Sequence, residues 1–204
     1  MRRREFAFLF GGATVAWPLL ARAQQKTVPI IGFLIGRSQE GSAHLIAGFR
    51  QGLAETGFVE GPSLAIDYRW AEGRYDRLAA FAADLVGRKV DAIVTVNTDA
   101  ARAAIAATGT TPIVFINGSD PVSDHLVTNL ARPSGNVTGV TFLAQELNRK
   151  LFEVLRELVP QARAIAVLLN QKNSTSERQL RDFQEVARGS GVELNTLEAS
   201  TKTS

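Results

Sequence analysis

The chain alternates short, continuous apolar runs with segments of helical periodicity, and this alternation limits its fold more than any other feature. The first run, VPIIGFLIG at 28–36, is rich in β-branched residues, which is typical of a strand covered on both faces. The next stretch places Ile46, Phe49 and Leu53 at helical spacing and ends near Gly57. Strands that alternate with helices of about 10 to 15 residues predict βαβ units and a parallel sheet.

Six further runs extend this pattern along the chain. Their ranges are 64–70, 91–96, 112–116, 136–142, 164–170 and 192–198. An alanine-rich helix is expected at about 98–108, with Asn97 or Thr98 as its cap. We therefore predict an α/β fold, with a first lobe that is a doubly wound parallel sheet of five strands. The last two runs predict a partial second lobe of Rossmann-like type.

An internal comparison supports the division into two lobes. At a shift of 134 positions, Phe49 meets Phe183 and Gly57 meets Gly191. A helix with Leu147, Leu151, Leu155 and Leu158 joins the two units, and Ser174-x-x-Glu177 predicts a capping box before the next helix. Two similar lobes in tandem indicate a ligand cleft between them.

The predicted lobes span 28–143 and 144–204. The second would have only two strands, which leaves an exposed sheet edge and an uncovered apolar face. We therefore expect a second lobe that is incomplete, in a chain that is either truncated or in need of a partner.

The N-terminus has the pattern of an export signal. Residues 1–23 combine charged residues, an apolar run from Phe6 to Leu20 and a small-x-small cleavage site at Ala21–Ala23. The run is shorter than the about 20 residues that a membrane-spanning helix needs. Arg3-Arg4-Glu5-Phe6 resembles the twin-arginine (Tat) export motif, although Ala7 and Phe8 depart from it and leave general secretion open as the route. The sequence predicts a periplasmic protein with a cleavable signal peptide.

Several kinds of chemistry have no support in the residues. The chain has no G-x-G-x-x-G, no Walker lysine motif, no G-x-S-x-G and no cysteine, so we expect no nucleotide cofactor and no thiolate metal site. His44 and His125 do not have the spacing of a metal pair. Outside the signal the basic and acidic residues are equal in number, which argues against nucleic acid as a partner.

The strand ends carry the candidate site. Ligands of open parallel sheets bind beyond the carboxyl ends of the strands. Small polar groups follow three of the predicted strands, at 36–40, 97–99 and 117–120. The start of a helix at Asn97 and Thr98 favours an anionic group, and Asp120 could accept from a ligand ammonium. The alternative is that these residues are turn formers and helix caps alone.

Several motifs resemble those of a known family. They are VPIIGFL, HLIAGFRQGLAETGFVEG, IDYRWAEGRYDRLAAFAADLV, PIVFINGSDPV and RPSGNVTGV. The chain resembles the substrate-binding proteins of ABC transporters, of the tryptophan/tyrosine type. The resemblance implies two lobes of the type I periplasmic-binding fold that close on a small solute and deliver it to ABC permease subunits in the inner membrane. By motif position, the ligand-binding residues it implies are Ser38, Asn97, Thr98, Asn117, Asp120 and, in the second lobe, Asn170.

The function we expect is therefore capture of an amino acid or a similar small organic acid, without catalysis and without a cofactor. Two alternatives stay open at this point. One is a non-functional truncated fragment of such a protein, since the chain is shorter than the family it resembles. The other is an α/β enzyme that uses Ser119 or Asp120, which the missing nucleophile elbow disfavours.

Overall fold

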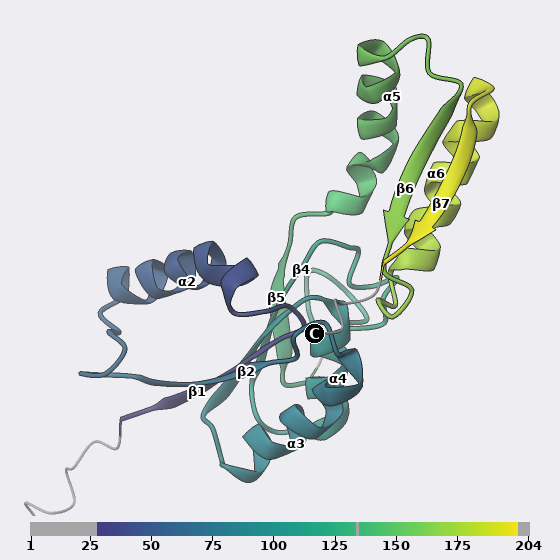
Figure 1. The fold of residues 1–204 in the computed structure, drawn as a ribbon. Helices are drawn as coiled ribbons and strands as arrows, with labels where there is room; N and C mark the ends of the chain where they lie inside the picture. The colour runs from purple at the N-terminus through teal and green to yellow at the C-terminus, as the bar shows by residue number, and fades with distance from the viewer. Residues whose placement is uncertain (1–27, 134, 200–204) are drawn as a thin grey trace, which may run out of the picture.

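The computed structural model describes residues 28–133 and 135–199 and places the strands in two separate sheets (Figure 1). The first sheet has five parallel strands in the order β2-β1-β3-β4-β5. The strands are β1 (Ile30–Ile35), β2 (Ala65–Trp70), β3 (Ala92–Val96), β4 (Ile113–Asn117) and β5 (Val137–Thr141). The order reverses direction between β1 and β3, which is the switch point where open sheets of this kind bind ligands.

Helices cover both faces of this sheet. The helices are α2 (Ala43–Glu55), α3 (Leu78–Gly87) and α4 (Thr98–Ala107), with the short turns η2 (Glu40–Ser42) and η3 (Tyr75–Arg77) leading into α2 and α3. On one face, Leu85 of α3 and Ala101 of α4 are fully buried with Ile93 and Ile113 of the strands. On the other face, Ile46 of α2 packs in a second cluster with Phe33, Ile35 and Val94. Continuous apolar strands are therefore explained by burial on both faces.

The second sheet pairs β6 (Ala164–Leu169) with β7 (Glu193–Glu198) in parallel. Two helices accompany it, α5 (Asn148–Leu158), which follows the turn η4 (Ala144–Leu147), and α6 (Ser176–Ser190). Phe152, Ile165 and Ala187 form the core of this lobe. Leu168 and Leu197 face the other way and are 68% and 53% exposed, so one face of this sheet is open among the described residues.

The predicted fold class is confirmed, including all seven strands, and of the two candidate caps of α4 the structure selects Asn97. The predicted capping box at Ser174 is wrong. The residue before α6 is Thr175, which makes no side-chain cap bond. Instead the side chain of Asn173 accepts hydrogen bonds from the amide and the hydroxyl of Thr175, because an Asx turn satisfies these donors locally.

The two lobe boundaries, 28–143 and 144–204, stay predictions. The predicted signal at 1–23 lies outside the described residues. Within 28–133 and 135–199, no helix is both long enough and apolar enough to cross a membrane.

Candidate functional site

A cavity of about 440 Å³ lies where β3 and β4 end and the second lobe approaches the first. This volume is within the range of about 300 to 1,000 Å³ that small-molecule sites occupy. Both lobes contribute to its wall. The lining residues are Arg37, Leu45, Val96, Asn97, Thr98, Ile116, Asn117, Gly118, Ser119, Phe142, Ala144, Asn148, Asn173, Thr175 and Gln179.

Asn97 stands at the end of β3 in a strained backbone conformation. Its φ of 87° and ψ of 161° lie in a region that is almost restricted to glycine and costs about 1 to 3 kcal/mol in other residues. Its side-chain oxygen accepts from the backbone amide of Ala100 at 2.9 Å, and its backbone amide donates to the carbonyl of Ile116 at 2.9 Å. The first bond holds the side chain and the second holds the backbone, despite the strain.

The hydroxyls of Thr98 and Ser119 form one buried network with the carboxylate of Asp124. The three residues are 4%, 2% and 0% exposed. The Thr98 hydroxyl lies 3.0 Å from Oδ2 of Asp124, and the Ser119 hydroxyl bonds the same oxygen. Oδ1 of Asp124 accepts from Nη2 of Arg178 at 2.8 Å. A buried carboxylate is tolerated only when its charge is compensated in this way, so the network is well fixed.

Two buried side-chain atoms in the cavity wall have no hydrogen-bond partner among the described residues. They are the amide oxygen of Asn117 and the amide nitrogen of Asn148, on side chains that are 2% and 4% exposed. An unpaired buried polar group costs about 1 to 3 kcal/mol, and most such groups in native proteins have a partner. The wall of the cavity therefore contains one free acceptor and one free donor.

Part of the wall is apolar. Val96 and Ile116 come from the strand ends, and Leu45 comes from the first turn of α2. Phe142 is 65% exposed, and its ring lies 3.2 Å from the position that a β carbon would take at Gly118. Apolar surface combined with polar groups that fix orientation is typical of sites for small organic molecules.

Of the predicted ligand residues, the structure brings Asn97, Thr98 and Asn117 together in this cavity. Asp120 lies outside its lining. Oδ1 of Asp120 accepts from the amide of Val122 at 3.0 Å and Oδ2 from the hydroxyl of Ser123 at 2.6 Å. The hydrogen bonds from Ser123 and Val122 hold the pKa of Asp120 below its ordinary value, with a smaller contribution from Arg178.

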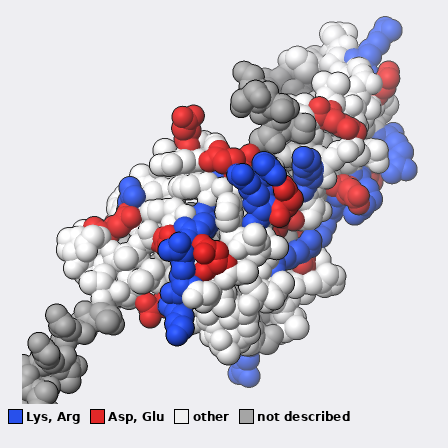
Figure 2. Space-filling model, turned by 60° about the horizontal axis from the view of Figure 1, so that its bottom comes forward, with Lys and Arg blue, Asp and Glu red and all other residues white. Residues whose placement is uncertain are grey.

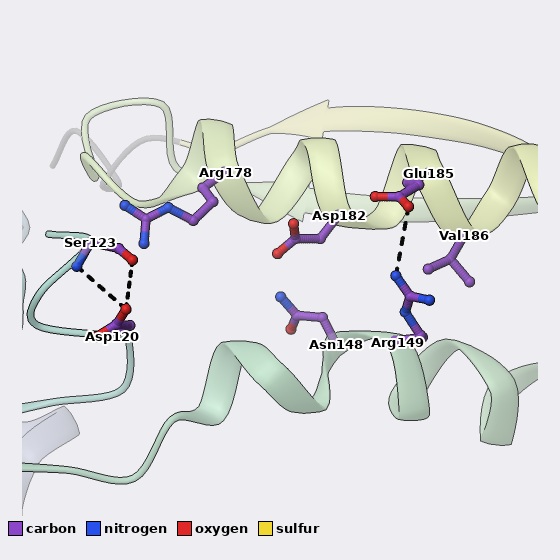
Figure 3. A pocket seen from close by; sticks show the side chains of 8 residues that line it. All are labelled: Asp120, Ser123, Asn148, Arg149, Arg178, Asp182, Glu185 and Val186. Carbon is purple, nitrogen blue, oxygen red and sulfur yellow. Dashed lines mark hydrogen bonds and ion pairs between the residues drawn. The ribbon is translucent and has the colours of Figure 1, made fainter.

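Asp120 instead lines a neighbouring groove of about 260 Å³ between the lobes (Figure 3). The figure shows Arg178 of α6 pointing toward the turn of Asp120 and Ser123. Asn148 lines both this groove and the larger cavity, so the two spaces adjoin. The other lining residues of the groove are Arg149, Asp182, Glu185 and Val186.

Ser38 and Asn170 are not among the lining residues of the cavity. The Ser38 hydroxyl accepts from the amide of Gly41 at 3.3 Å, and the Asn170 side chain accepts from the amide of Lys172 at 3.0 Å. Serine and asparagine often bond nearby backbone in this manner. Both side chains are therefore hydrogen-bonded within their own turns. Arg37, which precedes Ser38, lines the cavity.

The sequence prediction missed Asp124, Asn148, Phe142 and Arg178. Asp124 follows the Asp-Pro turn without any local pattern, and Arg178 comes from a helix far along the chain. Tertiary contacts within the first lobe bring Asp124 to the site, and the approach of the second lobe brings Arg178. On the face drawn in Figure 2, acidic and basic side chains are interspersed.

Comparison with known proteins places this geometry in a family context. The model of the family described as ABC transporter substrate binding protein matches residues 21–203. A tyrosine-binding protein from Clostridioides difficile strain R20291 is 30% identical over 148 residues, which are 72% of this chain and 42% of that protein. The chain thus spans less than half the length of this curated relative.

Two solved structures are similar as well. A conserved domain protein from Vibrio cholerae matches with a TM-score of 0.77 and 28% identity. An ABC domain from Streptococcus pneumoniae, solved in complex with L-Trp, matches with a TM-score of 0.73 and 27% identity. Each match covers 85% of this chain and 58% of the other. These likenesses confirm the predicted type I periplasmic-binding fold, of which the second lobe is partial.

Proposed function

The chain belongs to the ABC transporter substrate-binding protein family, and on this premise we propose that it captures an amino acid in the cavity between its lobes. The observation that carries the proposal is the pair of unpartnered buried atoms, Oδ1 of Asn117 and Nδ2 of Asn148, in the wall of that cavity. An acceptor and a donor together match the ammonium and the carboxylate of a zwitterion.

The electrostatics of the cavity favour the same orientation. The N-terminus of α4 opens at Asn97 and Thr98, where the helix dipole attracts a negative group. We place the carboxylate of the solute there and within reach of Asn148. The ammonium then lies toward Asn117, whose amide oxygen is the free acceptor.

The apolar wall favours a solute with a large apolar side chain. Phe142, Leu45 and Ile116 provide a ring and two aliphatic surfaces. An aromatic side chain on Phe142 would gain about 0.5 to 1.5 kcal/mol beyond the burial of its area. The tyrosine-binding and L-Trp-bound relatives, at 30% and 27% identity, support an aromatic amino acid.

We further propose that the chain acts as the solute-binding component of an importer. Its partners would be ABC permease subunits in the inner membrane, and its location the periplasm, reached through the signal at 1–23. We propose no enzymatic step, because the Ser119 hydroxyl is held by Asp124 and neither histidine lines the cavity.

Isothermal titration of the chain with each of the twenty L-amino acids tests the proposal. We expect saturable heat with an aromatic or branched amino acid. Asn117→Ala should abolish it, because it removes the free acceptor. Asn195→Ala, a change at an exposed position in β7, is the matched control and should bind as the parent does. Equal binding by Asn117→Ala and the parent, or no heat with any amino acid, would contradict the proposal.

A further inference from the structure

Two hydrogen bonds connect the start of α6 in the second lobe to the first lobe. The amide of Ser174 donates to Oδ2 of Asp99 at 3.3 Å. Nη2 of Arg178 donates to Oδ1 of Asp124 at 2.8 Å, and this bond is also an ion pair. Ser174 is 75 residues from Asp99 in sequence, and Arg178 is 54 residues from Asp124. Both contacts therefore depend on how the two lobes are placed.

Among the ion pairs of the described residues, Arg178–Asp124 is the one whose carboxylate is fully buried. The Asp124 side chain is 0% exposed and that of Arg178 is 33% exposed. By contrast, the Arg181–Glu177 pair on the same helix is 67% and 89% exposed, with its atoms 3.9 Å apart. Exposed pairs contribute little to stability, whereas a buried carboxylate without its partner is costly. Arg178 is therefore the cation that compensates the buried carboxylate of Asp124.

The two carboxylate oxygens of Asp124 bond to different lobes. Oδ1 is bonded to Arg178 of the second lobe, and Oδ2 is bonded to the hydroxyls of Thr98 and Ser119. Both hydroxyls belong to residues that line the cavity. A single carboxylate thus joins the wall of the solute cavity to the opposite lobe.

The surroundings fix Asp124 in this double role. Its carbonyl accepts from Nε and Nη2 of Arg102 at 3.4 and 3.2 Å, which ties its backbone to α4. Arg178 lies in the first turns of α6 and points toward the turn of Asp120 and Ser123 (Figure 3). Any movement of α6 away from the first lobe must break the bond to Oδ1 while the bonds to Oδ2 stay in the first lobe.

We propose that Arg178 is a positioning residue that couples the placement of the second lobe to the hydroxyl pair of the solute cavity through Asp124. This inference rests on the proposed function for the solute and extends it to a residue that does not line the cavity. When Arg178 moves away from Asp124, the carboxylate loses its compensating charge. Its hydrogen bonds must then come from the Thr98 and Ser119 hydroxyls or from water. By linkage, a solute that favours one arrangement of these hydroxyls favours the corresponding lobe placement.

The test measures lobe placement and solute affinity in the same variants. The chain has no cysteine, so Thr110→Cys and Gln184→Cys, at exposed positions of the two lobes, can carry spin labels for pulsed electron paramagnetic resonance. The parent should give one narrow distance distribution. Arg178→Met should give a broader distribution at longer distance, and its affinity for L-tyrosine or L-tryptophan should fall at least about tenfold.

Two further variants separate positioning from general stability. Arg178→Lys keeps the charge and should restore part of both the distance distribution and the affinity. Arg181→Met removes a charge from the same helix at an exposed pair and should match the parent in both. Arg178→Met should melt below the parent, because Asp124 then stays buried without its partner, whereas Arg181→Met should melt with the parent.

The outcomes distinguish this inference from the proposed function. If Arg178→Met has the distances and the affinity of the parent, the inference is wrong. If neither amino acid binds the parent while Arg178→Met alone shifts the distances, the choice of solute is wrong and the link between the lobes through Asp124 is supported. A shift that Arg181→Met reproduces overturns the inference, because a general loss of charge would then explain it.

Discussion

A β carbon placed on Gly36 would lie 2.4 Å from the side-chain nitrogen of Asn97. Gly36 follows β1 and Asn97 follows β3, and these strands are neighbours in the sheet. The missing side chain at one strand end thus makes room for the capping side chain of the next. The same imaginary carbon would also lie 2.9 Å from Cε1 of Tyr75, so the ring of Tyr75 forms a second wall of this space.

Gly36→Ala should therefore destabilise the protein by about 1 to 3 kcal/mol, the usual cost of overpacking, and should weaken solute binding by displacing Asn97. Urea unfolding and calorimetric titration measure the two effects. Gly48→Ala is a control for which we expect the opposite change in stability. Gly48 is exposed in α2 with open space around its β position, so alanine should stabilise by about 0.5 to 1 kcal/mol. Equal stability of Gly36→Ala and the parent would show that Asn97 does not need this space.

Substitutions of Asn97 should distinguish the cost of its strained backbone from the stability that its helix cap contributes. Asn97→Ala loses the hydrogen bond to the amide of Ala100 and keeps the strained φ of 87°, so we expect a loss of about 1 to 2 kcal/mol. Asn97→Gly relieves the strain and loses only a few tenths of a kcal/mol as a cap. It should be as stable as the parent or more so in urea unfolding. A glycine variant less stable than the alanine variant would contradict this assignment.

Asn117 and Asn136 should respond differently to alanine. Oδ1 of Asn117 is buried without a partner, so Asn117→Ala should leave the free energy of unfolding within about 1 kcal/mol of the parent. The side chain of Asn136 donates to the carbonyl of Thr111 at 2.6 Å. Asn136→Ala leaves that carbonyl unpaired and should cost about 1 to 3 kcal/mol. Urea unfolding without solute gives both values, and a larger loss at Asn117 than at Asn136 would count against a free acceptor in the cavity.

Asp120 should make part of the stability dependent on pH. Hydrogen bonds from Ser123 and Val122 lower its pKa in the folded protein, so the folded state binds a proton less readily than the unfolded state does. Its contribution is then complete at neutral pH and is lost as the pH falls below about 4, through the lowered pKa. Asp120→Asn should melt below the parent at pH 7, and the difference should shrink toward pH 2. Glu157→Gln, at an exposed position of α5, should show no such convergence.

Much of the fold could be predicted because its signals are local. Strands buried on both faces are continuous apolar runs in the sequence. The helix α4 is indicated by a run of alanines that follows a capping asparagine. The start of α6 could not be predicted in the same way. The sequence allowed a capping box at Ser174, but Asn173 satisfied the donors of Thr175 through a shorter-range turn, and the pattern alone does not rank these two solutions.

The site could be predicted only where it follows from the sheet. Asn97 comes directly after β3, and Asn117 is the last residue of the neighbouring parallel strand β4, so topology alone places them together. Asp120 and Ser38 also follow strands, but their side chains are used by their own turns. Asp124 and Arg178 are brought together by the approach of two lobes, which no local pattern encodes.

The central claim is that the strand ends at Asn97, Thr98 and Asn117 contact the solute. The most direct measurement is a titration of the ¹⁵N-labelled chain with L-tyrosine and L-tryptophan, followed by the amide resonances. We predict saturable shifts of residues 97–99 and 117–119, with little change in β7. Shifts confined to other regions, or none at saturating solute, would contradict the claim.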